Sequence, residues 1–287
     1  MRAGEIKPLG LRDVGVEEDF YAVGDLTPDD VEFLRRAVIA NSPVNLRRLH
    51  VELLRDFGLV ASANQLLKRE PEMANGAKEQ IRVIVSNLDE NYHETIEHDL
   101  QHAINCMLRG SVEFFNDAGV AGMFLRALAL FSMRTKRTRE RIKKLVCVPL
   151  PRFDFDRIYG PMIHMLAVNL GANLLADRAK YRIVLLHNET HIPFITGDQP
   201  VLNIHEDRDE TGTPRDIEWY MPLSPRLAMV YVSAEGAPES GSVSITAQEA
   251  TNYCMRIAEN HYDQLYGTDE AMLLPYLLFS SGSSDAN

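Results

Sequence analysis

Three polar residues are the strongest candidates for chemistry in this sequence. Asp198 follows the apolar pair Phe194-Ile195 and precedes Pro200, so its carboxylate is expected at the end of a short strand. Glu97 lies in a predicted long helix, and Arg134 ends an apolar one. A general base, a guanidinium that binds an anion and a second carboxylate are groups that a hydrolase or phosphodiester-cleaving enzyme can use. Two carboxylates could also hold a divalent metal.

Each of these residues also has a structural interpretation. Asp198 can accept backbone N–H groups in its own turn. Glu97 can support its helix through His93, four residues earlier, and Arg134 can complement the C-terminus of the preceding helix. The second hypothesis is therefore a non-enzymatic binding or regulatory protein. In that protein these charges form a buried ionic network that fixes the helical part against the rest.

Further arginines extend the candidate site along the predicted helix 120–133 and the basic run after it. Arg137 shares a helical face with Arg134, and a row of guanidinium groups suits phosphate or carboxylate. Arg126 lies inside the apolar run, so it needs an acidic partner, and Glu97 is the predicted one. The expected ligand is a small molecule or a phosphate-containing compound. RNA is a weaker alternative, because the formal charge of −11 repels a polyanion.

Two pairs of histidines were considered as proton carriers or metal ligands. His187 and His191 flank the end of a predicted strand before Asp198, where imidazole could shuttle a proton, and surface loop histidines are the alternative. His98 and His102 have the spacing of a helical metal site. A rotation of about 100° per residue puts them opposite the apolar stripe of their helix. The sequence therefore assigns no metal ligand.

Helical signals dominate the chain up to about residue 178. Thr27 and Pro28 predict the start of one helix. A second helix is expected from Ser42-Pro43 to near Gly58, where glycine favours a stop. Further helices are expected over residues 77–108, 120–133, 158–178 and 247–260.

After residue 178 the apolar pattern becomes that of short strands. They are expected at residues 182–186, 193–195, 201–204 and 227–232. The predicted fold class is α+β: a helical body (residues 1–178) joined to a strand-rich part (residues 179–287) with a small mixed or antiparallel sheet and a terminal helix. No linker rich in glycine or proline divides the two parts, so one domain with a shared core is expected.

The composition favours a soluble, cytoplasmic protein. Hydrophobic residues make up 45% of the chain and charged residues 25%, which are ordinary values for a globular protein. The sequence shows no clear apolar run of membrane-spanning length, and its N-terminus lacks the apolar core of a signal peptide. A membrane is therefore not expected as a partner.

The order of several motifs resembles a bacterial family known as domain of unknown function 4238. Members of that family show an isoleucine-glutamate pair, an arginine-threonine-proline, a phenylalanine-isoleucine-threonine-serine-aspartate-asparagine-proline and a proline-leucine-serine-proline. The matching segments here, over about residues 90–265, are Ile96-Glu97, Arg134-Thr135, residues 194–200 and residues 222–225. Gly197 and Gln199 replace the serine and the asparagine, and Lys136 replaces the proline.

Members of this family also begin with a histidine-x-x-proline motif, which is absent before Tyr21 in this chain. If that histidine belongs to the family's site, this protein is expected to be catalytically weakened. The resemblance implies no established activity, so it leaves both functional hypotheses open.

Overall fold

The computed structural model describes residues 6–8, 26–70, 75–145, 154–210 and 214–277, without the side chains of residues 82 and 84–97. Its helices, with η for 3₁₀ turns, are α1 (Pro28–Ala37), η1 (Ile39–Asn41), α2 (Val44–Arg69), α3 (Asn75–Leu108), η2 (Glu113–Asn116), α4 (Ala118–Met133), α5 (Lys136–Leu145), α6 (Phe155–Ala176), η3 (Arg178–Lys180), α7 (Ala247–Asn260), α8 (Glu270–Leu273) and η4 (Leu274–Tyr276). Its strands are β1 (Tyr181–His187), β2 (Thr196–Gly197), β3 (Leu202–Asn203), β4 (Trp219–Ser224), β5 (Leu227–Ser233), β6 (Ser242–Ser244) and β7 (Leu265–Tyr266). The predicted α+β class is confirmed.

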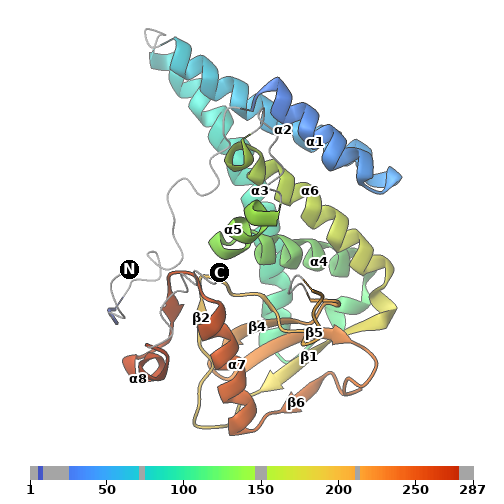
Figure 1. The fold of residues 1–287 in the computed structure, drawn as a ribbon, viewed down its shortest axis with the longest axis vertical. Helices are drawn as coiled ribbons and strands as arrows, with labels where there is room; N and C mark the ends of the chain where they lie inside the picture. Colours follow the sequence, from blue (N-terminus) through green and yellow to red (C-terminus); the bar gives the residue numbers. More distant parts are fainter. Residues whose placement is uncertain (1–5, 9–25, 71–74, 146–153, 211–213, 278–287) are drawn as a thin grey trace.

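The strands form one mixed sheet and one small strand pair. The sheet has the order β3-β4-β5-β1-β6, in which β1 pairs antiparallel with β5 and parallel with β6. β2 and β7 form a separate antiparallel pair. The sheet lies at one end of the molecule, and the long helices of the N-terminal part extend away from it (Figure 1).

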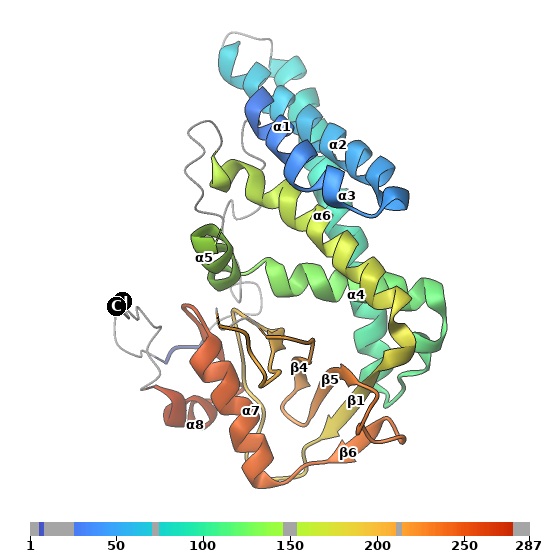
Figure 2. The same ribbon diagram turned by 45° about the vertical axis from the view of Figure 1, so that its right-hand side comes forward.

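Side chains of the central strands alternate between two apolar cores. On β5, Leu227, Met229 and Tyr231 pack with the helical part, whereas Ala228 and Val230 pack with α7. Successive residues of a strand point to opposite faces, so the helical part covers one face of the sheet and α7 the other (Figure 2). Burial on both faces explains why β1 and β5 read as continuous apolar runs.

The larger of the two apolar cores is continuous from the helices to the sheet. It includes Leu125 and Leu128 of α4 together with Leu185 of β1 and Trp219 of β4. One domain with a shared core stays a prediction. The division of the chain at residue 178 stays a prediction, and the first strand begins close to it, at Tyr181.

The prediction that the second helix ends near Gly58 was wrong, because α2 continues to Arg69. A glycine inside a helix costs roughly 1 kcal/mol relative to alanine. Phe57, Val60 and Ala61 are buried around this position. Burial of side chains of this size offsets a cost of that magnitude, so the helix runs through the glycine.

The strand pattern was predicted only in part. β1, β3 and β5 lie where strands were expected, but β2 begins at Thr196 rather than at residue 193, and β4 was not predicted. Within β4, Pro222 pairs with Ala228, and the register shifts between Pro222 and Ser224. Proline has no N–H to donate to a neighbouring strand, and such an irregularity accommodates it. The proline therefore hid β4 from the sequence pattern.

Among the described residues, α6 is the helix that is long and apolar enough to cross a membrane by length and composition. In its most apolar stretch 56% is buried inside the protein. Its neighbours include α4, α2 and α1. More than half of the most apolar stretch of α6 is therefore covered by the rest of the protein.

α4 and α6 approach each other closely at Gly171. A Cβ atom at this position would lie 2.9 Å from both the Cα and the backbone nitrogen of Arg126. Real Cβ atoms do not come that close to a backbone, so the absence of a side chain permits this approach. Gly171 thus sets the distance between the two central helices.

Gly171→Ala is expected to lower the free energy of unfolding by about 1–3 kcal/mol, because the new methyl group overlaps the backbone of α4. Gly58→Ala is the matched control, since nothing lies within 4 Å of a Cβ atom there. The control should raise stability by roughly 0.5–1 kcal/mol. Urea unfolding measures both changes, and equal effects of the two substitutions would contradict the close approach.

A buried carboxylate joins α1 to α6. Asp30 has an exposed fraction of 0%. Its oxygens accept from Arg157 Nε at 2.9 Å, from the Thr27 N–H at 2.9 Å and from the Asp154 N–H at 3.3 Å. Burial raises the pKa of Asp30, but the hydrogen bonds from Arg157, Thr27 and Asp154 together outweigh it and hold the pKa below its ordinary value of 3.8.

Because the pKa of Asp30 is lower in the folded than in the unfolded protein, its carboxylate contributes stability above its unfolded pKa, and this contribution is lost as the pH falls through the folded pKa. Asp30→Asn should therefore lower the free energy of unfolding at pH 7 by about 3 kcal/mol, since it leaves Arg157 without its buried anion. The deficit should shrink below about pH 4. Denaturant unfolding at several pH values measures it. The exposed Asp29→Asn is the control, and a deficit independent of pH would contradict this account.

Candidate functional site

Asp198 lies directly after β2, and its carboxylate accepts three backbone N–H groups. Oδ1 accepts from Tyr262 at 2.8 Å, and Oδ2 accepts from Asp263 at 2.5 Å and from Gln264 at 3.0 Å. The N–H of Asp198 also donates to the carbonyl of Gln264 at 3.1 Å. The structural interpretation placed such bonds in its own turn. The structure places them in the turn that follows α7.

Arg137, from α5, binds the C-terminal end of α7. Its Nη1 donates to the carbonyl oxygens of Glu259 at 3.0 Å and of His261 at 3.3 Å. A cation is favourable at this end of a helix, where carbonyl groups lack partners. Burial lowers the pKa of Arg137, as does the charge of Arg141, whereas the charge of Asp198 raises it. Arg137 and Asp198 therefore act on the same end of α7.

Two further contacts join α5 to these segments. The Lys136 ammonium lies 3.3 Å from an oxygen of Asp263. Gln199 Nε2 donates to Thr138 Oγ1 at 3.1 Å, and Thr138 Oγ1 donates to the carbonyl of Ser132 at 3.0 Å. We call this set the α5–α7 joint, and its members are Lys136, Arg137, Thr138, Asp198, Gln199 and the turn of residues 262–264. The joint ties the end of the helical part to both β2 and α7.

Arg126 has an acidic partner on α3, Asp99. Its Nη2 lies 2.9 Å from Oδ2 of Asp99, whose side chain is 9% exposed. The prediction named Glu97, whose side chain lies outside the described residues. Arg134 ends α4, with its guanidinium 4.5 Å from the centre of the Phe131 ring. The separation of Glu97 from Asp198 thus stays a prediction.

The four histidines considered as proton carriers or metal ligands, at positions 98, 102, 187 and 191, are not members of the α5–α7 joint. His187 is the last residue of β1 and is half-buried, and His191 is exposed. No contact among the described residues links His187 to Asp198. His98 and His102 are exposed, as predicted for the solvated face of α3. Within the described ranges no group of three or more His, Cys, Asp or Glu side chains is placed to hold a metal ion.

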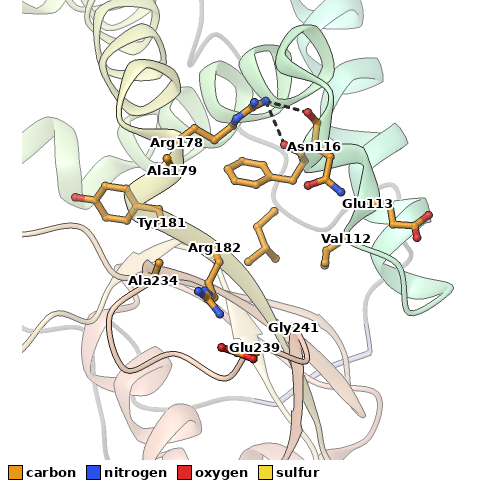
Figure 3. A pocket seen from close by; sticks show the side chains of 12 residues that line it. Val112, Glu113, Asn116, Arg178, Ala179, Tyr181, Arg182, Ala234, Glu239 and Gly241 are labelled. Atoms are coloured by element: carbon orange, nitrogen blue, oxygen red, sulfur yellow. Dashed lines mark hydrogen bonds between the residues drawn. The ribbon is translucent and has the colours of Figure 1, made fainter.

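A cavity of about 440 Å³ lies in a different place, between η2 and the start of β1. Its size is within the range of small-molecule sites. Its walls come from residues 112–116, from residues 178–183 and from the turn of residues 234–241 (Figure 3). The charged residues of its lining are Glu113, Arg178, Arg182 and Glu239. None of the residues predicted from the sequence contributes to it.

Sequence reasoning missed the two arginines of this cavity. Arg178 is the first residue of η3, just after α6, and Arg182 is the second residue of β1. The signal that could have found them is a pair of cations around the start of a buried strand. The partners on η2 lie more than sixty residues away in the sequence, as the contact of Arg178 with Phe115 shows. Only the fold brings these segments together.

A family model described as protein of unknown function (DUF4238) matches residues 1–271. The chain belongs to this family. The match is longer than the resemblance over residues 90–265, and it includes the N-terminal residues, in which no histidine-x-x-proline motif is present. Comparison with curated proteins and with solved structures gave no match.

Three of the DUF4238 motifs are connected in space. Gln199, in the motif of residues 194–200, bonds to Thr138, just after the arginine-threonine motif. Phe194, at the start of the same motif, donates its N–H to the carbonyl of Pro225 at 3.0 Å. Pro225 closes the proline-leucine-serine-proline motif between β4 and β5. The motifs therefore form one set of packing contacts around the α5–α7 joint.

Asp99→Asn is expected to lower the free energy of unfolding by about 1.5–3 kcal/mol, because it weakens a charge-assisted bond to Arg126 that lies largely away from water. Glu52→Gln is the control, since the pair of Glu52 with Arg48 has side chains 56% and 91% exposed. That change should stay within about 1 kcal/mol. Chemical unfolding of both variants measures the difference. A loss at Glu52 as large as at Asp99 would contradict the assignment of Asp99 as the partner.

Proposed function

We propose that this protein is a non-enzymatic binding protein in which the α5–α7 joint is a structural ionic network. The observation that carries the proposal is the set of three backbone N–H groups that bond to the Asp198 carboxylate. In the enzyme hypothesis Glu97 is the general base and Asp198 is the second carboxylate, which must offer oxygen lone pairs to a substrate or a metal. A carboxylate has about four acceptor positions, and three of those of Asp198 bond to the turn after α7, so little acceptor capacity is left for a ligand.

The contacts of Arg137 also support a structural role. Its Nη1 donates to two main-chain carbonyls at the end of α7. Unlike Arg178 and Arg182, Arg137 does not line the cavity beside η2. The negative charge of Asp198 acts on the positive charge of Arg137. Arg137 binds carbonyl groups at the end of α7, and Asp198 accepts N–H groups of the turn that follows it. Such a network fixes how α7 docks without any chemical step.

The competing hypothesis is a hydrolase or phosphodiester-cleaving enzyme that uses Glu97, Arg134 and Asp198, with a divalent metal as an optional cofactor. It requires Asp198 to meet Glu97 at a substrate with the acceptor capacity that its three backbone partners leave. The bonds of Asp198 favour the binding protein over this alternative. Arg126, expected as an anion-binding residue, pairs with Asp99, which also favours the binding protein.

Asp198→Asn is expected to lower the free energy of unfolding by about 2 kcal/mol, since an amide group turns one acceptor into a donor that faces backbone N–H groups. For a chain of this size that corresponds to roughly 4–8 °C in Tm. Asp263→Asn is the matched control, because its ion pair with Lys136 has side chains 48% and 39% exposed. The control should stay within about 1 kcal/mol. Thermal and chemical unfolding measure both variants.

The same proteins are then assayed with a chromogenic phosphodiester, with and without added Mg²⁺ or Mn²⁺. The binding protein predicts no turnover that depends on Asp198. Turnover by the parent protein that is lost in Asp198→Asn, at an unchanged Tm, would reject the proposal in favour of the enzyme.

A further inference from the structure

The cavity beside η2 combines an apolar surface with a charged rim. Phe115 and Ile183, which line it, are 9% and 2% exposed. The rim carries the guanidinium groups of Arg178 and Arg182 and the carboxylates of Glu113 and Glu239. The α5–α7 joint contributes none of these groups, so the cavity is a separate place for a ligand.

Main-chain carbonyls hold both arginines in position. Nη1 of Arg178 donates to the carbonyls of residues 115–116 at 3.3 Å, and Nη1 of Arg182 donates to those of residues 237–238 at 3.3–3.4 Å. A guanidinium has five N–H donors, so each arginine keeps donors that no other described residue accepts. A planar guanidinium whose orientation is already fixed suits a carboxylate, which accepts two parallel bonds.

The two carboxylates balance the charge of the two arginines. Figure 3 shows the Arg182 guanidinium directed toward Glu239, while Glu113 lies beside Val112 at another part of the rim. Two cations and two anions leave no net formal charge at the rim. A simple anion would therefore meet two like charges, and the net charge of −11 would also repel it at long range. A zwitterion avoids both penalties.

Gly241 keeps one side of the cavity open. Its φ of +67° lies in the left-handed region, which glycine adopts at little cost. A Cβ atom there would lie 3.5 Å from Cγ2 of Val112, so a side chain would fill space between two walls of the cavity. The turn of residues 234–241 thus approaches η2 without closing the gap.

We propose that this cavity binds a small zwitterion with an apolar side chain, of the chemical class of the hydrophobic α-amino acids. The ligand carboxylate bonds to the Arg182 guanidinium, the ammonium group lies near Glu113 or Glu239, and the apolar side chain packs against Phe115 and Ile183. This inference rests on the proposed function, because it names the ligand of the same binding protein.

The first experiment is calorimetric titration of the full-length chain with L-phenylalanine as the probe. Two analogues each remove one charge: N-acetyl-L-phenylalanine lacks the ammonium group, and L-phenylalaninamide lacks the carboxylate. Phenylalanine is expected to bind at least about tenfold more tightly than either analogue, which corresponds to the loss of one charged contact.

Variants locate the site. Arg182→Gln should weaken phenylalanine binding about tenfold or more, whereas Arg48→Gln, a change on the exposed face of α2, should not affect it. Arg182 also bonds to the turn of residues 237–238, so the substitution could change stability as well as binding. The Tm of the Arg182→Gln variant is therefore compared with that of the parent protein. The double variant Glu113→Gln with Glu239→Gln leaves both arginines intact. It should remove the preference for phenylalanine over its N-acetyl analogue, which a merely structural role would not do.

The outcomes separate this inference from the proposed function. Equal binding of phenylalanine and N-acetyl-phenylalanine would overturn the zwitterion and leave an apolar carboxylate as the ligand. If no probe gives a heat of binding at about 10 mM, the inference is overturned altogether. This concentration is above a weak Kd of about 1 mM. In both cases the non-enzymatic function is still decided by Asp198→Asn, because Asp198 does not line this cavity.

Discussion

The turn after α7 is organised around one carboxylate, that of Asp198. The chain turns sharply after this helix, and the N–H groups of residues 262–264 have the Asp198 carboxylate as their acceptor. The N–H of Tyr262 is partly buried, and a buried N–H group without an acceptor costs about 1–3 kcal/mol. Asp263 and Gln264 are exposed, so water can also serve their N–H groups. Arg137 satisfies carbonyls at the same helix end. One anion and one cation thereby fix the helix that covers the second face of the sheet.

The two faces of the sheet are held in different ways. The face toward the helical part packs through a continuous apolar core. Apolar packing is strong but non-directional, so it tolerates small shifts between layers. The face toward α7 also has an apolar core, and the α5–α7 joint adds directional bonds at the end of that helix. Directional bonds select one orientation of α7 against the sheet.

The cavity beside η2 shows how a possible binding site can arise without a sequence motif. Its charged groups come from a helix end, a strand start and a turn, and each of these reads alone as ordinary surface. The close-packed helices and the strand fix the distances between them, as the bonds of Arg178 to residues 115–116 illustrate. Binding groups on rigid elements are held more precisely than groups on loops.

The sequence by itself determined the long helices and their caps, because apolar periodicity and capping act over a few residues. α3, α4 and α7 lie close to where they were predicted, and Thr27 accepts the N–H of Asp30 as expected of an N-cap. Strand β4 was missed because Pro222 mimics a turn, although pairing with β5 makes it a strand.

Only the tertiary structure decided which charged residues meet. Arg126 pairs with Asp99, a residue that no pattern in the sequence singled out. Successive residues of a helix differ by about 100° in direction, so the carboxylate that meets Arg126 depends on how α3 is rotated against α4. The acceptors and donors around Asp198 lie more than sixty residues away in the sequence, as its bond to Tyr262 shows. No local pattern encodes such a distance, because it is set by how whole elements pack.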